Sequence, residues 1–322
     1  MSEIIDTAFL KSICEELARD LNYQPEKPLT EDNISYRALQ KEFAQYNTAK
    51  QWFHNICLTA ATMAELPYPG LSEEIRYYVA KYTWLALYVD DMEHSHAQPE
   101  RISSFQRSII DVTAAEPEGE LLQALRKHLA ESYRLFEPMA ADGIVLCAMD
   151  FIHGSLLEQM SKVQRMRLTN ASASWPYYLR RKAGSSIGYG FMLFPKEANV
   201  DISVYIQVID DMTLVTDLTN DVFSFYKEQL AGDQQNYVYN RAAVTQRSIK
   251  DTLKDLAEES IQANSRITQV LESSGNTTAL DIWRNFVNGY IGFHFTLNRY
   301  RLQELVDHSA LSTYSKSGSL RE

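Results

Sequence analysis

The segment from Asp201 to Ala231 contains neither glycine nor proline, and Gly232 follows it directly. Because those two residue types most often interrupt or end helices, an unbroken run of this length predicts a long helix that stops at Gly232. The rest of the chain follows the same pattern, with only 12 glycines and 9 prolines in 322 residues. Long apolar stripes at helical spacing, separated by few helix breakers, predict an all-α protein.

The middle of that segment carries a ridge of polar side chains. Residues four apart on a helix lie nearly above one another, so Asn220, Ser224 and Glu228 share one face. An amide oxygen, a hydroxyl and a carboxylate are hard ligands that suit magnesium. Aromatic residues occupy the other faces of this helix. A solvated helix face is the alternative interpretation, because the same three residue types are common on protein surfaces.

A second acidic site, Asp90–Asp91, lies at the end of another apolar helical run that begins near Ile75. Adjacent carboxylates at the end of a buried stripe are costly unless a positive charge neutralises them. A bound metal cluster would supply that charge. Taken alone, this motif also fits a solvated helix end.

The two sites together resemble those of the class I terpene synthases, and most closely those of the fungal trichodiene synthase family. In that family an Asp-rich motif and an Asn/Ser/Glu triad face each other across a single-domain helical barrel and hold three magnesium ions against a substrate diphosphate. Asp90–Asp91 looks like the first motif, and the string NDVFSFYKE fills the triad completely. The resemblance implies that Asp90, Asn220, Ser224 and Glu228 bind metal.

Residues similar to those with which the family binds diphosphate occur in the same order, within a resemblance that spans Ile75 to Leu302. The family has an arginine sensor before the triad helix, a lysine next to the triad glutamate, and an arginine–tyrosine pair near the C-terminus. The matching residues are Arg180, which aligns better than its neighbour Arg181, together with Lys227 and the pair Arg299–Tyr300.

One position departs from the family pattern Asp-Asp-x-x-Asp. The fifth residue is His94, and the acid falls one place earlier, at Glu93. One residue turns a helical side chain by about 100°, so Glu93 cannot simply replace the missing carboxylate. By resemblance we expect Asp90 to bridge metal ions and Asp91 to pair with Arg299. Glu93 and His94 are then expected to lie outside the set of direct metal ligands.

The resemblance also implies a substrate and a product. It points to farnesyl diphosphate, to a cyclic sesquiterpene or its alcohol, and to a homodimer. Metal ions and cationic side chains would neutralise the departing diphosphate, and aromatic rings would stabilise the remaining carbocation. Five aromatic residues are candidates for the wall of that pocket: Phe53, Trp84, Phe191, Trp283 and Phe295.

Charge and cysteine content limit the partners and the compartment. The chain has 31 Lys+Arg against 42 Asp+Glu, a formal net charge of −11, which argues against nucleic acids and anionic membranes as partners. Cys14, Cys57 and Cys147 lack the spacing of a metal site or disulfide framework. The N-terminus has no signal-peptide pattern, and no stretch approaches the length of a membrane span. We therefore expect a cytoplasmic protein.

No linker or internal repeat divides the chain, so we expect one domain over residues 1–308 and a polar, mobile tail over residues 309–322. Gly184, Gly188 and Gly190 follow a helical segment instead of a strand. This pattern argues against a nucleotide-binding loop and favours a helix break beside the arginine sensor. Asp210–Asp211, nearly three turns before the triad, is interpreted as surface charge.

Three alternatives to a terpene cyclase remain. A prenyl chain-elongating synthase would need a second Asp-rich motif, and Asp210–Asp211 does not supply one because its fifth position is Leu214. A helical metal phosphohydrolase would need a His-Asp dipeptide, which the sequence does not contain. A non-catalytic acidic protein that binds partner peptides would show no magnesium-dependent turnover.

Overall fold

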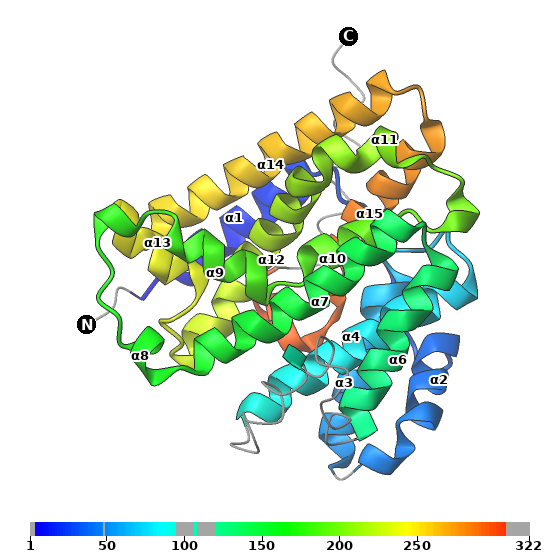
Figure 1. Ribbon diagram of the computed structural model, residues 1–322. Coiled ribbons are helices and arrows are strands. Elements are labelled where there is room, and N and C mark those ends of the chain that lie inside the picture. Colours follow the sequence, from blue (N-terminus) through cyan, green and yellow to red (C-terminus); the bar gives the residue numbers. More distant parts are fainter. Residues whose placement is uncertain (1–3, 48, 95–105, 108–119, 307–322) are drawn as a thin grey trace. The chain divides into compact units, whose positions relative to one another are not determined.

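Figure 1 shows the computed structural model, which describes residues 4–47, 49–94, 106–107 and 120–306. Within these ranges every regular element is a helix, so the expected all-α class is confirmed. The chain divides into two compact units. The first contains Met1–Pro28, Arg167–Tyr178 and Ser203–Glu322, and the second contains Leu29–Met166 and Leu179–Ile202. One domain over residues 1–308 stays a prediction, and the tail over residues 309–322 lies outside the described residues.

The first unit is built around α12, which packs against α1, α14 and α15. A long helix, α14, lies along α12 (Figure 1). The elements of this unit are α1 (Thr7–Asp20), η2 (Asn170–Ser172), α11 (Ile202–Tyr205), η4 (Ile206–Val208), α12 (Ile209–Ala231), α13 (Tyr237–Thr245), α14 (Ile249–Ser273), α15 (Thr277–Thr296), η5 (Asn298–Tyr300) and η6 (Leu302–Glu304).

The predicted helix over residues 201–231 is present, but its first turns are separate. A short α11 and a 3₁₀ turn, η4, precede α12. The predicted stop at Gly232 is confirmed, because Gly232 adopts the left-handed region with φ of 73°. The backbone N–H groups of Gly232 and Asp233 then donate to the carbonyls of Gln229 and Glu228, at 3.1 and 3.0 Å. These bonds satisfy carbonyls that a helix end otherwise leaves unpaired.

The second unit contains α4, which carries the acidic motif and packs against α2, α3, α6 and α7. In the same unit, α7 packs closely against α10. The elements are α2 (Ile34–Glu42), η1 (Ala44–Tyr46), α3 (Lys50–Glu65), α4 (Glu73–His94), α6 (Glu120–Leu135), α7 (Pro138–Gln159), α8 (Ser161–Gln164), the end of α9 (Trp175–Ala183), α10 (Ser186–Met192) and η3 (Lys196–Ala198).

The helix α7 corrects one expectation. It is 22 residues long, and among the described residues it is the one helix long and apolar enough to cross a membrane. The expectation that no stretch approaches that length was wrong for α7. The helix packs against α4, α6 and α10, and its side chains Ile144 and Ile152 are fully buried. α7 is thus a core helix of the second unit.

The predicted helix break beside Arg180 is confirmed. α9 ends at Ala183, Ser185 has a left-handed φ of 54°, and α10 begins at Ser186. α7 approaches this break closely through Gly154, where an added Cβ would lie only 2.7 Å from the backbone nitrogen of Ala183. Glycine at this position allows α7 to approach the backbone at the end of α9.

Candidate active site

The ridge on α12 is the centre of the candidate site in the first unit. Asn220, Ser224 and Glu228 follow one another at one-turn intervals on a single continuous helix. Ser224 is 1% exposed, whereas Asn220 and Glu228 are partly buried. Phe223 and Phe225 beside them are fully buried, so the other faces of the helix pack in the core. The predicted common face of the three oxygen-bearing residues is therefore present.

Asn220 is held by a histidine from another helix. Its Nδ2 donates to Nε2 of His294 on α15 at 3.0 Å. The other ring nitrogen, Nδ1, donates to the carbonyl oxygen of Tyr290 at 2.7 Å. His294 is completely buried, and burial lowers its pKa to about 3. The nearby charge of Lys227 acts in the same direction. The ring is therefore neutral at physiological pH.

Ser224 provides a test of whether a metal fits this face. Its Oγ is buried, and no described residue forms a hydrogen bond with it. An unpaired buried hydroxyl costs roughly 1–3 kcal/mol of folding free energy, so it calls for an explanation. A hard cation between the neighbouring ligands would supply the missing partner. The residues present on this face therefore fit a magnesium ion.

Glu228 is positioned from the following helix. Its Oε2 accepts a hydrogen bond of 2.9 Å from Nδ2 of Asn236, the N-cap residue of α13. Nζ of Lys227 lies 3.7 Å from the other oxygen, Oε1. One carboxylate thus has a fixed donor on one oxygen and a cation beside the other. Both contacts restrict the orientation of the carboxylate.

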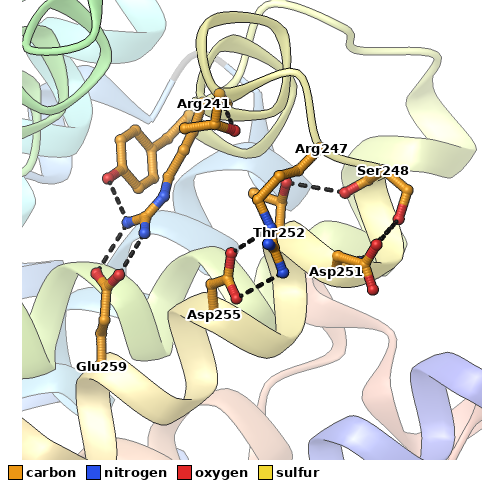
Figure 2. Close-up of polar contacts among 9 residues, drawn as sticks. Arg241, Arg247, Ser248, Asp251, Thr252, Asp255 and Glu259 are labelled. Atoms are coloured by element: carbon orange, nitrogen blue, oxygen red, sulfur yellow. Dashed lines mark hydrogen bonds and ion pairs between the residues drawn. The ribbon is translucent and has the colours of Figure 1, made fainter.

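Polar contacts between α13 and α14 hold Asn236 in place. Figure 2 shows Arg241 of α13 reaching the carboxylate of Glu259 on α14 through both terminal nitrogens, one of them at 2.9 Å. Arg247, just after α13, reaches Asp255 with Nε 2.7 Å from Oδ2. Such two-pronged arginine–carboxylate pairs restrict orientation as well as distance. They fix α13 on α14 and so its N-cap beside Glu228.

The predicted arginine–tyrosine pair lies after α15. α15 stops at Thr296, and an extended residue, Leu297, precedes the 3₁₀ turn η5 that contains the pair. This bend turns Tyr300 inward, where it is 5% exposed. Its ring lies 4.4 Å from the ring of His294 and 5.3 Å from Nζ of Lys227. Lysine, tyrosine, histidine and asparagine therefore form one connected group.

Arg299 and Arg301 differ in availability. Arg299 is exposed, and no carboxylate among the described residues pairs with it. Arg301 instead donates to both oxygens of Glu304, at 2.7 and 2.9 Å. An arginine already paired with a carboxylate is a weaker candidate for an anionic substrate. This contrast supports the choice of Arg299 from the sequence.

The remaining predicted polar residues lie in the second unit. Asp90 is partly buried near the end of α4. The side chains of Asp91, Glu93 and His94 lie outside the part of the chain that the structure describes. Arg180 is partly buried on α9, whereas Arg181 is exposed. The structure thus brings together the triad, Lys227 and Tyr300 in the first unit, and it places Asp90 and Arg180 in the second.

Comparison with known proteins identifies the family. Residues 20–317 match the family model described as Trichodiene synthase (TRI5). The chain belongs to the trichodiene synthase family. Terpene synthase BipA of Cochliobolus sativus is 33% identical over 300 residues, which cover 91% of this chain and 89% of that protein. Monoterpene synthase 25 of Postia placenta is 33% identical over 193 residues, 59% of this chain and 56% of the relative.

A solved structure shows the same fold. The linalool/nerolidol synthase of Streptomyces clavuligerus, in complex with 2-fluorogeranyl diphosphate, has a TM-score of 0.57 and 13% sequence identity. The match covers 82% of this chain and 95% of that structure. At this identity the likeness shows the fold alone. Together with the family match, it establishes that this member of the trichodiene synthase family is an enzyme with the class I terpene synthase fold.

The five candidate pocket aromatics of this family member are all buried. In the first unit, Trp283 donates from Nε1 to Oδ1 of Asn264 at 2.9 Å, and Phe295 stacks on Tyr23. In the second unit, Trp84 stacks on Phe43 with ring centroids 3.7 Å apart, and Phe191 packs against Gly143 of α7; Phe53 is buried on α3. Their place in a pocket wall stays a prediction.

Two residues with clear contacts to the triad were not assigned a role from the sequence. Neither His294 nor Asn236 is among the candidate site residues taken from the sequence. A signal for Asn236 exists, because it follows a short polar loop after Gly232 and precedes a helical run, as an N-cap does. No comparable signal points from His294 to Asn220, because 74 residues separate them.

Proposed function

We propose that this enzyme ionises farnesyl diphosphate with the help of magnesium and cyclises the resulting carbocation to a sesquiterpene or sesquiterpene alcohol. The observation that carries the proposal is the buried Oγ of Ser224, which lies between Asn220 and Glu228 and has no hydrogen-bond partner among the described residues. The amide nitrogen of Asn220 is bound to His294, so the amide oxygen is the atom left for a metal. One oxygen of Glu228 accepts from Asn236, and the carboxylate is held in place by that bond. This is the donor set that magnesium prefers.

In this proposal Asp90, Asn220, Ser224 and Glu228 hold the metal, and the family resemblance implies three ions. When bound, magnesium supplies positive charge that stabilises the departing diphosphate. The contribution of the chain is to keep these oxygens in place. Lys227 helps because its Nζ lies close to both Glu228 and the ring of Tyr300.

Four residues are proposed to bind the diphosphate: Arg180, Lys227, Arg299 and Tyr300. Arginine suits this task because its planar fork binds phosphate oxygens in pairs. Arg299 is exposed and has no carboxylate partner among the described residues, whereas Arg301 is paired with Glu304. We propose Asp91 as the partner that orders Arg299 after the substrate binds.

The chain length of the substrate and the cellular setting are also proposed. One relative is named a monoterpene synthase, so the comparison must include geranyl as well as farnesyl diphosphate. The farnesyl group is favoured here by the family resemblance. The three cysteines are buried and form no disulfide with one another, which suits a reducing compartment such as the cytoplasm. A homodimer is proposed on the family resemblance alone.

A chain-elongating function finds less support. Such an enzyme would need metal ligands at Asp210–Asp211. Asp211 is instead engaged by Arg266, whose Nη2 donates to Oδ1 at 2.6 Å and whose Nε lies 3.1 Å from Oδ2. Asp210 is exposed on the surface of α12. A carboxylate already paired with an arginine, as Asp211 is, has less tendency to bind a metal ion.

The test is a product assay with three substrates. Purified enzyme is incubated with geranyl, farnesyl or geranylgeranyl diphosphate, with magnesium or with a chelator, and diphosphate release and volatile products are measured. We expect farnesyl diphosphate to give hydrocarbon or alcohol products only with magnesium, and Glu228→Gln to abolish them. Longer prenyl diphosphates formed with added isopentenyl diphosphate would indicate elongation instead. No release from any of the three substrates would refute the proposal.

A further inference from the structure

His294 determines which end of the Asn220 amide faces the triad. The carbonyl oxygen of Tyr290 can only accept a hydrogen bond, and it lies 2.7 Å from Nδ1 of His294. Nδ1 must therefore carry the ring proton. In a neutral imidazole the other nitrogen, Nε2, is then an acceptor. The amide nitrogen that the structure places 3.0 Å from Nε2 agrees with this acceptor role.

The acceptor at Nε2 fixes the amide of Asn220. The atom of Asn220 that lies 3.0 Å from Nε2 has to be a donor, which is the amide nitrogen Nδ2. The oxygen and nitrogen are the two separate arms of the planar amide. The contact of Nδ2 with His294 thus leaves Oδ1 as the arm that is not bound to the ring. If the amide were reversed, a lone pair of Oδ1 would face the lone pair of Nε2 of His294, and the hydrogen bond would be lost.

The imidazole itself cannot easily rotate. The rings of Tyr290 and Phe293 meet it edge-on, with centroids 4.7 and 5.0 Å away. Phe223 and Tyr300 lie against it at 5.4 and 4.4 Å. Tyr290 is in turn fixed to α12, because its hydroxyl donates to the carbonyl oxygen of Thr216 at 3.1 Å. The orientation of the His294 ring between α12 and α15 is therefore fixed.

We propose that His294 is a positioning residue that holds the Asn220 amide with Oδ1 presented as a metal ligand and Nδ2 withheld from the metal. The inference rests on the proposed function, because it assumes that the α12 triad binds magnesium. It extends that function because the tautomer of the buried His294 ring determines that Oδ1, and not Nδ2, of Asn220 is the metal ligand. His294 touches neither metal nor substrate in this role.

The test compares metal binding in four variants by calorimetry with magnesium and inorganic diphosphate. His294→Leu removes the acceptor, and we expect about tenfold weaker magnesium binding, the usual loss when a residue that orients a ligand is removed. His294→Gln can still offer an acceptor to Asn220, so it should recover most of the affinity. Phe286→Leu removes a buried ring two turns earlier on α15 and controls for general destabilisation.

The fourth variant separates orientation from packing. Asn220→Asp has two equivalent oxygens, so it needs no selection between nitrogen and oxygen. We expect His294→Leu to cause little further loss of magnesium affinity in that background. An equal tenfold loss in both backgrounds, or no loss in the wild-type background, would overturn the inference. If wild-type enzyme bound no magnesium with diphosphate, the proposed function itself would fail instead.

A measurement on the unaltered enzyme covers the case in which a variant does not fold. Nitrogen-15 NMR of histidine-labelled protein distinguishes a protonated from an unprotonated ring nitrogen, and the chain has only 7 histidines. We expect His294 to carry its proton on Nδ1 in the absence and presence of magnesium. A proton on Nε2 would contradict the inference, because Asn220 would then have to turn its oxygen towards the ring.

Discussion

The two helices with proposed metal ligands, α12 in the first unit and α4 in the second, present their ligands differently. On α12 the three ligands are one turn apart, and Asn220 and Glu228 are held by side chains of α15 and α13. On α4 the acids are adjacent, so neighbouring side chains point about 100° apart. Spacing by whole turns determines a face from the sequence, whereas adjacency leaves the register of the motif open.

Both motifs also lie near the C-terminal end of their helix, where the helix dipole is negative and favours a cation. On α12 this end contains Glu228, and Lys227 already places a positive charge 3.7 Å from it. On α4 the end carries Asp90, Asp91 and Glu93 within the last five residues. The acidic end of α4 has the greater excess of negative charge in its sequence. A metal ion should therefore matter at least as much to α4 as to α12.

The largest expected effect tests whether the two helices act on the same metal cluster. Asp90→Asn, Asn220→Leu and Glu228→Gln should each lower turnover by about a hundredfold or more, because each removes stabilisation of the departing diphosphate. The measurement is kcat/KM over a magnesium titration. A near-normal rate for Asp90→Asn, with large losses for the two α12 variants, would remove α4 from the proposed metal site and leave the ligands on α12.

A smaller effect tests the support of α12. Asn236→Ser keeps a side chain that caps α13 but loses the amide that donates to Glu228. We expect magnesium to bind about tenfold more weakly, measured as a higher magnesium concentration for half-maximal turnover. The melting temperature should change little. Thr245→Ala, at the other end of the same helix, is the matched control because it removes only a local hydroxyl bond. Equal effects of the two substitutions would show that the loss concerns α13 in general.

The register of α4 is tested by the residues that depart from the family pattern. Glu93→Gln and His94→Ala should each reduce turnover by tenfold or less, because neither is expected to bind metal directly. Histidine nitrogen is also a softer ligand than magnesium prefers. A Glu93→Gln variant as impaired as Asp90→Asn would show that the acidic motif uses Glu93 as a ligand, so that the register proposed for α4 is wrong.

The sequence predicted what depends on local periodicity. The all-α class, the stop at Gly232 and the shared face of the triad follow from helical spacing and helix breakers. The partners of the triad did not follow, because His294 and Asn236 approach α12 from other helices. Contacts between helices depend on tertiary packing, which a single sequence does not encode at a fixed spacing. The 3₁₀ turn before α12 and the bend at Leu297 were missed for the same reason.

The pocket aromatics offer a comparison between the units that does not depend on metal binding. Replacing Phe295 of the first unit or Phe191 of the second by leucine should change the product mixture more than the rate of diphosphate release. Ionisation depends on the metal ligands, whereas an aromatic face acts on the later carbocation. Gas chromatography of the products, with diphosphate release measured in parallel, separates the two effects. Unchanged products from either variant would remove that residue from the proposed wall.

The smallest expected effect concerns a second fully buried histidine, His128 of the second unit. His294 has partners on both ring nitrogens, but neither nitrogen of His128 has a hydrogen-bond partner among the described residues. The ring stacks on Tyr78, with centroids 4.1 Å apart, and its Nδ1 is 3.6 Å from Glu131. Burial lowers the pKa of His128, although the nearby carboxylate of Glu131 acts in the opposite direction.

A lowered pKa in the folded state has a defined consequence for stability. Below the ordinary histidine pKa of about 6.5 the unfolded chain takes up a proton that folded His128 does not, so the free energy of unfolding falls as pH falls. The limiting slope is about 1.4 kcal/mol per pH unit for one group. His128→Phe should remove this contribution, so the stability of the variant relative to wild type should rise between pH 7 and pH 5. Urea unfolding at several pH values measures the difference. A difference independent of pH would mean that His128 has the same pKa in the folded and unfolded chain, and a difference that falls as pH falls would mean that Glu131 raises the pKa of the folded ring.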